Sequence, residues 1–210
     1  MLFVSYSRLR PFFMLILSLT ALTSPGSSVR PSTVQSSPPS TSDVPAYLPA
    51  GEFGAGLMPI ILYSMGEPSL LEAAKGVNVR CFRVSYISFP STRQVAVRLV
   101  INTNGSGQVA SAVKSAEGKE VERMKGNVSA ADIKSFLQLV EKSGFWSMSS
   151  IEQKPDEASR RTYTMDGMIW MLEGVDNGSF HYVYRPNPSP GPFKEIARYL
   201  VDSLPKLATP

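Results

Sequence analysis

This 210-residue chain has little of the chemistry from which most protein sites are built. It contains one cysteine, Cys81, and one histidine, His181. A disulfide within the chain is therefore excluded, and so is a zinc or copper site made of several imidazoles. The chain also lacks a Gly-x-Ser-x-Gly elbow and the closely spaced acidic residues of a calcium loop. We expect no metal and no cofactor.

A concentrated positive charge is missing as well. The formal net charge is +4, and Lys and Arg are scattered, with Arg160 and Arg161 the only adjacent pair. Nucleic-acid binders carry a basic stripe or patch, so we expect no nucleic-acid partner.

The start of the chain is typical of an export signal. Arg8 and Arg10 precede an apolar run from Phe12 to Leu22, and small residues follow. This run is shorter than the roughly 20 residues that span a bilayer, so residues 1–26 are predicted to be a cleaved signal peptide. Release into the periplasm or the extracellular space is the expected outcome. The alternative is an inner-membrane anchor through residues 12–22, and only then would the protein contact a membrane.

Composition divides the remainder into two parts. Residues 27–54 are rich in Pro, Ser and Thr, which cannot bury enough apolar surface to offset their ordering entropy, so a disordered tether is predicted. Residues 55–207 are expected to form one domain, which we take to be monomeric.

Alternating apolar residues predict the strands of that domain. They run over Arg80–Ser88, Val95–Ile101 and, after a turn at Asn104-Gly105, Val109–Val113; a weaker strand is expected over 120–125. Helical spacing predicts two main helices, over 129–144 and 190–204, and a short one over 68–75. The expected class is α+β, an antiparallel sheet of about four to six strands with the two main helices on one face.

A second hairpin is predicted from Gly167 to Val175 and from Ser179 to Arg185, around a turn at Asn177-Gly178. A two-residue turn places Gly174 opposite His181 and puts two mostly apolar sets of side chains on opposite faces. One face carries Ile169, Met171, Glu173, Val175, Phe180, Tyr182 and Tyr184, and the other carries Trp170, Leu172, Gly174, His181, Val183 and Arg185.

Three interpretations of this hairpin stay open. In one, His181 is a core group facing Gly174 while Arg185 stacks on Trp170. In another, Trp170, His181, Tyr184 and Arg185 line a binding surface, since aromatic residues and Arg dominate contact energies. In the last, the protein is a hydrolase that uses His181 with Glu173 or Asp166, although Glu173 lies on the other face in this register.

Cys81 lies on the strand face opposite to Phe82. The apolar segment Leu57–Met65, interrupted by Pro59, is expected to fold across that face and bury the thiol.

The hairpin also carries a resemblance. Asp166-Gly167, Trp170, Leu172-Glu173-Gly174, His181, Val183 and Arg185 resemble the pattern D-G-x-x-W-x-L-E-G followed by H-x-V-x-R of a group of uncharacterised secreted bacterial proteins. The resemblance implies a bacterial envelope setting and no particular activity. The expected function is that of a non-enzymatic binding or structural module of the cell envelope, whose partner is an envelope protein or ligand.

Mass spectrometry of the exported protein tests the predicted signal. The mature chain should begin between about residues 24 and 29, where small residues follow the apolar run. An intact Met1 in the membrane fraction would contradict cleavage and favour the anchor.

Overall fold

The computed structural model describes residues 45–50, 57–115, 117, 120–151 and 167–209. All of them belong to the unit formed by residues 39–210. The predicted signal peptide, the possible anchor at 12–22, most of the tether and Asp166 lie outside the described residues.

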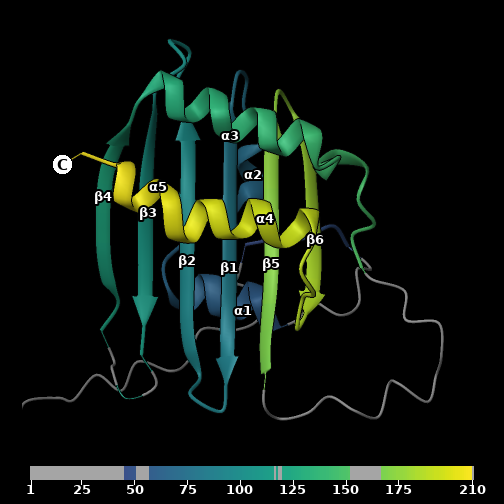
Figure 1. The fold of residues 1–210 in the computed structure, drawn as a ribbon. Helices are drawn as coiled ribbons and strands as arrows, with labels where there is room; N and C mark the ends of the chain where they lie inside the picture. The colour runs from purple at the N-terminus through teal and green to yellow at the C-terminus, as the bar shows by residue number, and fades with distance from the viewer. Residues whose placement is uncertain (1–44, 51–56, 116, 118–119, 152–166, 210) are drawn as a thin grey trace, which may run out of the picture. The chain divides into compact units, whose positions relative to one another are not determined.

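Six antiparallel strands form one sheet in the order β4-β3-β2-β1-β5-β6 (Figure 1). The strands are β1 (Arg80–Phe89), β2 (Arg93–Ile101), β3 (Gly107–Lys114), β4 (Glu122–Val128), β5 (Gly167–Asp176) and β6 (Ser179–Pro186). With the helices described below, they confirm the α+β class and the number of strands. The weak strand expected over 120–125 is β4, shifted toward the C-terminus.

The β5–β6 hairpin has the predicted register. Asp176 pairs with Ser179 and Gly174 with His181. Asn177 and Gly178 both have positive φ, 48° and 87°, as a two-residue hairpin turn requires. The pairing of β1 with β5, by contrast, joins strands about 90 residues apart. It connects strands β1 to β4 with the β5–β6 hairpin in one sheet.

Two helical segments lie on the face of the sheet that carries Phe82, which we call the front face (Figure 1). They are α3 (Ala130–Lys142) and a C-terminal segment made of α4 (Pro192–Arg198), the π-helical turn η4 (Tyr199–Ser203) and α5 (Leu204–Leu207). Ser129 caps α3, because its hydroxyl accepts a hydrogen bond from the Asp132 backbone N–H.

The C-terminal helix begins later than the sequence indicated. Gly191 precedes it with a φ of 149°, a conformation that favours glycine, and Pro192 occupies the first helical position, where its missing N–H costs nothing. The expected start near residue 190 is therefore wrong.

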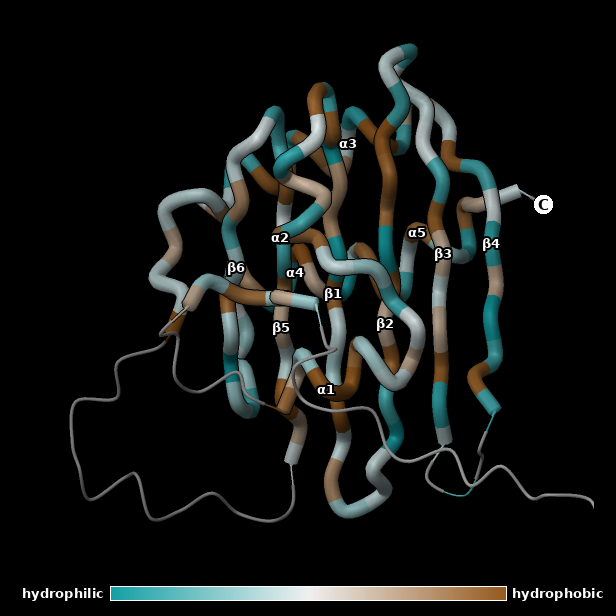
Figure 2. The backbone as a smooth tube through the Cα atoms, turned by 180° about the vertical axis from the view of Figure 1, so that it is seen from behind, coloured by the Kyte–Doolittle hydropathy of each residue, from teal (hydrophilic) through white to brown (hydrophobic). Residues whose placement is uncertain are grey.

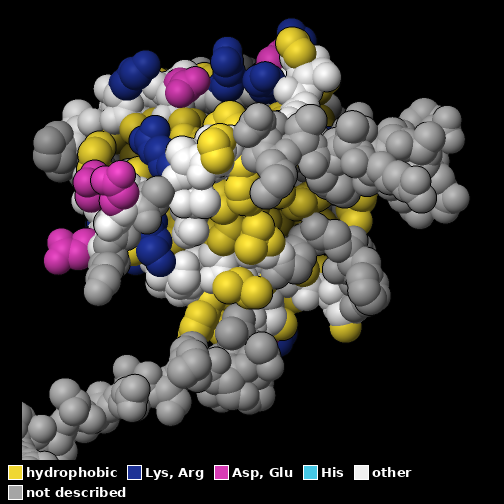
Figure 3. Space-filling view, turned by 90° about the horizontal axis from the view of Figure 1, so that it is seen from below, with side chains coloured by type: hydrophobic (Ala, Val, Ile, Leu, Met, Phe, Trp, Pro, Cys, Tyr) yellow, Lys and Arg dark blue, Asp and Glu magenta, His cyan; other side chains and the backbone are white. Residues whose placement is uncertain are grey.

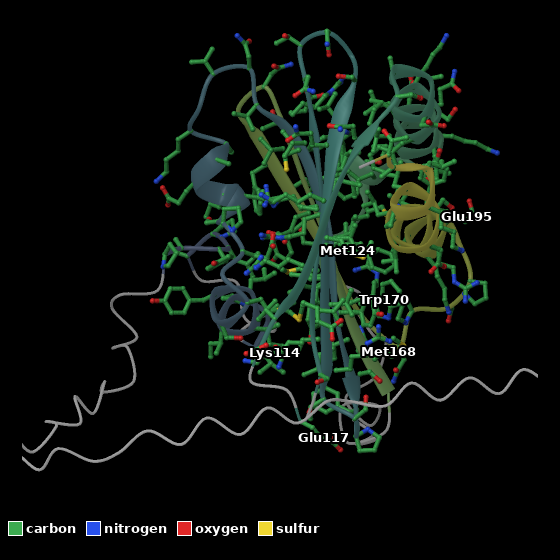
Figure 4. The ribbon with its side chains drawn as sticks, turned by 90° about the vertical axis from the view of Figure 1, so that its left-hand side faces the viewer. Lys114, Glu117, Met124, Met168, Trp170 and Glu195 are labelled. Carbon is green, nitrogen blue, oxygen red and sulfur yellow. The ribbon has the colours of Figure 1, made fainter. Side chains whose placement is uncertain are left out.

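The opposite face, which we call the back face, carries α1 (Leu57–Ser64) and α2 (Leu70–Ala73) (Figure 2). Pro59 fits because it lies in the first turn of α1, where backbone N–H groups have no helical partner. Figure 4 shows the resulting three layers from the β4 edge, with Trp170 on the side of α4. Helices thus cover both faces of the sheet, because both faces of the central strands are mostly apolar.

Cys81 is buried as expected, but Leu70 of α2 and Val175 cover it. The segment Leu57–Met65 packs in a separate cluster on the same face, so its expected role in burying the thiol is wrong. Burial raises the pKa of the Cys81 thiol to about 12.

Residues 45–50 of the predicted tether are described by the structure. Tyr47 is buried on the back face beside Met58, because its ring offers apolar area that the surrounding prolines do not.

Replacing Leu200 by Ala tests the front-face core. Leu200 is fully buried, so the substitution should lower the free energy of unfolding by about 2–5 kcal/mol in urea denaturation. The control is Met124→Ala at an exposed position of β4, which should change it by less than about 0.5 kcal/mol. Equal effects of the two substitutions would contradict the packing described.

Candidate functional site

The four residues predicted to form a binding surface do not lie together. Trp170, His181 and Arg185 are on the front face, and Tyr184 is on the back face. Trp170 is only 7% exposed and its ring stacks on Tyr86 with 4.7 Å between ring centroids. The structure therefore places most of the Trp170 surface in the core.

Arg185 and His181 contact the segment that follows α3. The Arg185 guanidinium donates to the Ser149 carbonyl at 2.8 Å and lies over the Phe193 ring, 5.9 Å from its centroid. The His181 ring meets Phe145 edge to face at 5.1 Å. Burial lowers the pKa of His181, and hydrogen bonds with the backbone of Met148 and Phe145 offset only part of this effect.

His181 and Glu173 are not brought together. They project from opposite faces, because Glu173 opposes Tyr182 while His181 opposes Gly174. The Glu173 carboxylate is occupied by Arg83 on β1, and Asp166 lies outside the described residues. A histidine–carboxylate pair is thus not assembled by the described residues.

Arg83 and Glu173 form a fully buried ion pair across β1 and β5. Arg83 Nε lies 2.7 Å from Glu173 Oε2, and Nη2 lies 2.7 Å from Oε1, which is a bidentate arrangement. Burial opposes the charged form of Arg83, but the Glu173 charge and hydrogen bonds outweigh it and raise the pKa of Arg83. Both side chains have 0% exposure, so the ion pair is a structural element of the core.

Glu67 extends this pair into a charged cluster. Its carboxylate lies 3.1 Å from Arg98 Nε and 3.6 Å from Arg123 Nη1, and the Tyr47 hydroxyl donates to its backbone carbonyl. Arg83 also donates to the Pro68 carbonyl at 2.6 Å. These bonds fasten the segment between α1 and α2 to the back face of the sheet.

A groove of about 730 Å³ lies on the front face, between α3 and the neighbouring ends of β1, β2 and β5. We call it the α3 groove. Phe82 and Ile101 contribute apolar floor from the sheet, Leu137 lines it from α3, and Trp146 lines it from the turn after α3. Its volume is within the range of about 300–1,000 Å³ found for small-molecule sites.

Local sequence directs Trp146 to this groove. Gly144 ends α3 in the left-handed conformation, with a φ of 66°, and the chain then forms the 3₁₀ turn η2 (Phe145–Ser147). Phe145 packs over Gly174, where an added Cβ would lie 2.6 Å from its ring. With Phe145 anchored, Trp146 stays 38% exposed and contacts Phe82 edge to face.

The charged groups of the α3 groove balance one another. Arg80 and Asp176 are cross-strand partners, and Arg80 Nη2 lies 2.6 Å from Asp176 Oδ2. Lys134 and Glu141 line the groove from α3. Two positive and two negative side chains leave the lining without net charge.

Hydrophobic side chains gather on the lower end of the molecule, the end where α1 lies (Figure 3). α1 exposes Leu57 and Ile60. These side chains have no hydrogen-bonding group with which to orient a small ligand, so we place the candidate site in the α3 groove instead.

Within the described part of the chain, no group of three or more His, Cys, Asp or Glu side chains is arranged to hold a metal ion. None of the helices in that part is long and apolar enough to cross a membrane.

The chain matches no protein-family model, no curated protein and no solved structure. The function proposed below therefore depends on the chain's own residues.

Sequence reasoning missed the groove residues Arg80, Asp176 and Trp146. Arg80 and Asp176 meet only because β1 pairs with β5. These strands are not joined by a short turn, so the sequence has no local signal for their pairing. Trp146 had a signal, since Gly144 follows a helical pattern and marks where the chain turns.

Removing one partner of the buried ion pair tests its structural role. Glu173→Gln removes the bidentate partner of the buried Arg83 charge and leaves it only the Glu67 carboxylate, 3.9 Å away, so the substitution should cost about 3–5 kcal/mol of unfolding free energy. The double variant Arg83→Met with Glu173→Leu should recover most of this loss, because an apolar pair of similar size needs no desolvation of charge.

Glu122→Gln, at an exposed position of β4, is the matched control for loss of a strand carboxylate, and should change stability by less than about 0.5 kcal/mol. A Glu173→Gln protein as stable as this control in urea denaturation would contradict the assigned role.

Proposed function

We propose that this protein is an exported, non-enzymatic binding module of the bacterial cell envelope, and that its ligand occupies the α3 groove. The observation that carries the proposal is the groove itself. It combines an apolar floor, a half-exposed tryptophan and polar side chains from three strand ends and a helix. Such a mixture of apolar surface and a few convergent polar groups is characteristic of small-molecule sites.

The groove chemistry supports binding more than turnover. Asp176 is engaged by Arg80, and His181, the only imidazole, is not among the groove-lining residues. General acid–base catalysis requires a titratable group within hydrogen-bond reach of the reacting atoms. A groove whose Asp176 carboxylate is held by Arg80 is better suited to holding a ligand than to transferring protons.

The cellular setting of the proposal comes from the sequence. The basic and apolar start of the chain supports export, and the resemblance of the β5–β6 hairpin supports a bacterial envelope. We take the protein to act as a monomer in the periplasm or outside the cell.

Cosedimentation with purified envelope fragments tests this function. The exported wild-type protein should be retained with the fragments, and retention should fall several-fold in Trp146→Ala and in Gln138→Ala, because both side chains line the groove. Gln138 is exposed on α3, so its replacement should leave the melting temperature unchanged.

The matched control is Gln108→Ala, which removes an exposed amide from the back face on β3. It should be retained like the wild type. Equal retention of the Gln138 and Gln108 variants would show that the α3 groove is not the binding site and would overturn the proposal.

A further inference from the structure

We infer that the ligand of the α3 groove is a neutral oligosaccharide. The inference rests on the proposed function and adds the chemical class of the ligand. Three features of the groove lead to it: its charge balance, its amide side chains and its exposed indole.

Charge balance excludes a strongly charged ligand. Arg80 Nη2 pairs with Asp176 Oδ2 at 2.6 Å, and Lys134 and Glu141 contribute one charge of each sign from α3. An anionic or cationic chain would meet as many repulsive groups as attractive ones and would gain little from the site. A ligand without net charge does not meet this electrostatic repulsion.

The remaining polar side chains are suited to hydroxyl groups. Asn78, Asn102, Gln138 and Asn177 all line the groove and are exposed. A carboxamide both donates and accepts hydrogen bonds, as a hydroxyl does, so each amide can pair with a sugar hydroxyl, although one N–H of Asn102 already donates to the Ser106 hydroxyl at 3.0 Å. Four such groups around one groove favour a ligand with many hydroxyls over one with a single polar end.

Trp146 supplies the apolar contact that a sugar ring needs. The face of an indole carries partial negative charge and attracts the polarised C–H groups on the apolar face of a pyranose. Trp146 keeps 38% of its surface exposed although it packs against Phe82 and Phe145. Burying an exposed indole under a sugar ring would remove this apolar area from water.

Tryptophan fluorescence of the exported protein gives a direct test, because the chain has two tryptophans and Trp170 is stacked and buried. Titration with chitotetraose and with cellotetraose should shift and saturate the emission for at least one of them. The two probes distinguish an N-acetylated from an unsubstituted chain. Trp146→Ala should abolish the emission change and weaken binding about five- to tenfold by calorimetry.

Gln138→Ala should weaken binding about two- to tenfold and Gln108→Ala should leave it unchanged. Because the ligand is neutral, its affinity should stay constant between about 0.05 and 0.5 M salt. Trp146→Phe, which keeps an aromatic ring, should bind within about threefold of the wild type and so separates loss of stacking from loss of folding.

Failure of both tetrasaccharides to bind would overturn the inference, and so would tighter binding of tetra-alanine or of tetragalacturonate. In either case, envelope retention that still depends on Gln138 would leave the proposed binding function standing. Release of shorter sugars during the titration would instead overturn the non-enzymatic assignment.

Discussion

The ion pair of Arg83 and Glu173 is the constraint on which the rest of the structure depends. It lies where β1 meets β5, and so joins the four strands from β1 to β4 to the hairpin of β5 and β6. A charged pair without solvent is tolerated only when its geometry is good and its remaining donors are satisfied. Both conditions hold, since the two charges meet through two bonds of 2.7 Å and the third donor reaches the Pro68 carbonyl.

The same pair links the sheet to the helical layer on its back face. Pro68 and Glu67 belong to the connection between α1 and α2, and Glu67 is shared by Arg83, Arg98 and Arg123. A one-residue slip of β5 against β1 would move Glu173 to the front face and leave Arg83 without its partner. The buried charges thus specify register, whereas the apolar side chains around them supply most of the free energy of folding.

The front face follows from the register set on the back face. With β1 and β5 in place, Arg80 opposes Asp176, and Gly174 leaves room for Phe145 beneath the turn that carries Trp146. The α3 wall of the groove is determined by local sequence signals, because α3 begins at a capping serine and ends at a left-handed glycine. The floor and the far wall are not local, because they come from strands distant in the sequence.

The sequence by itself determined the elements whose signals are local. Asn177-Gly178 specified a two-residue turn and hence the face of every side chain in the β5–β6 hairpin, and Ser129 specified the start of α3. Only the tertiary structure decided that β1 pairs with β5, that Tyr47 packs on the back face of the sheet, and that Arg80, Asp176 and Trp146 share one groove. The physical reason is that hairpin turns and helix caps act through neighbouring backbone groups. The pairing of the central strands β1 and β5 is instead determined by burial and charge pairing across the whole domain.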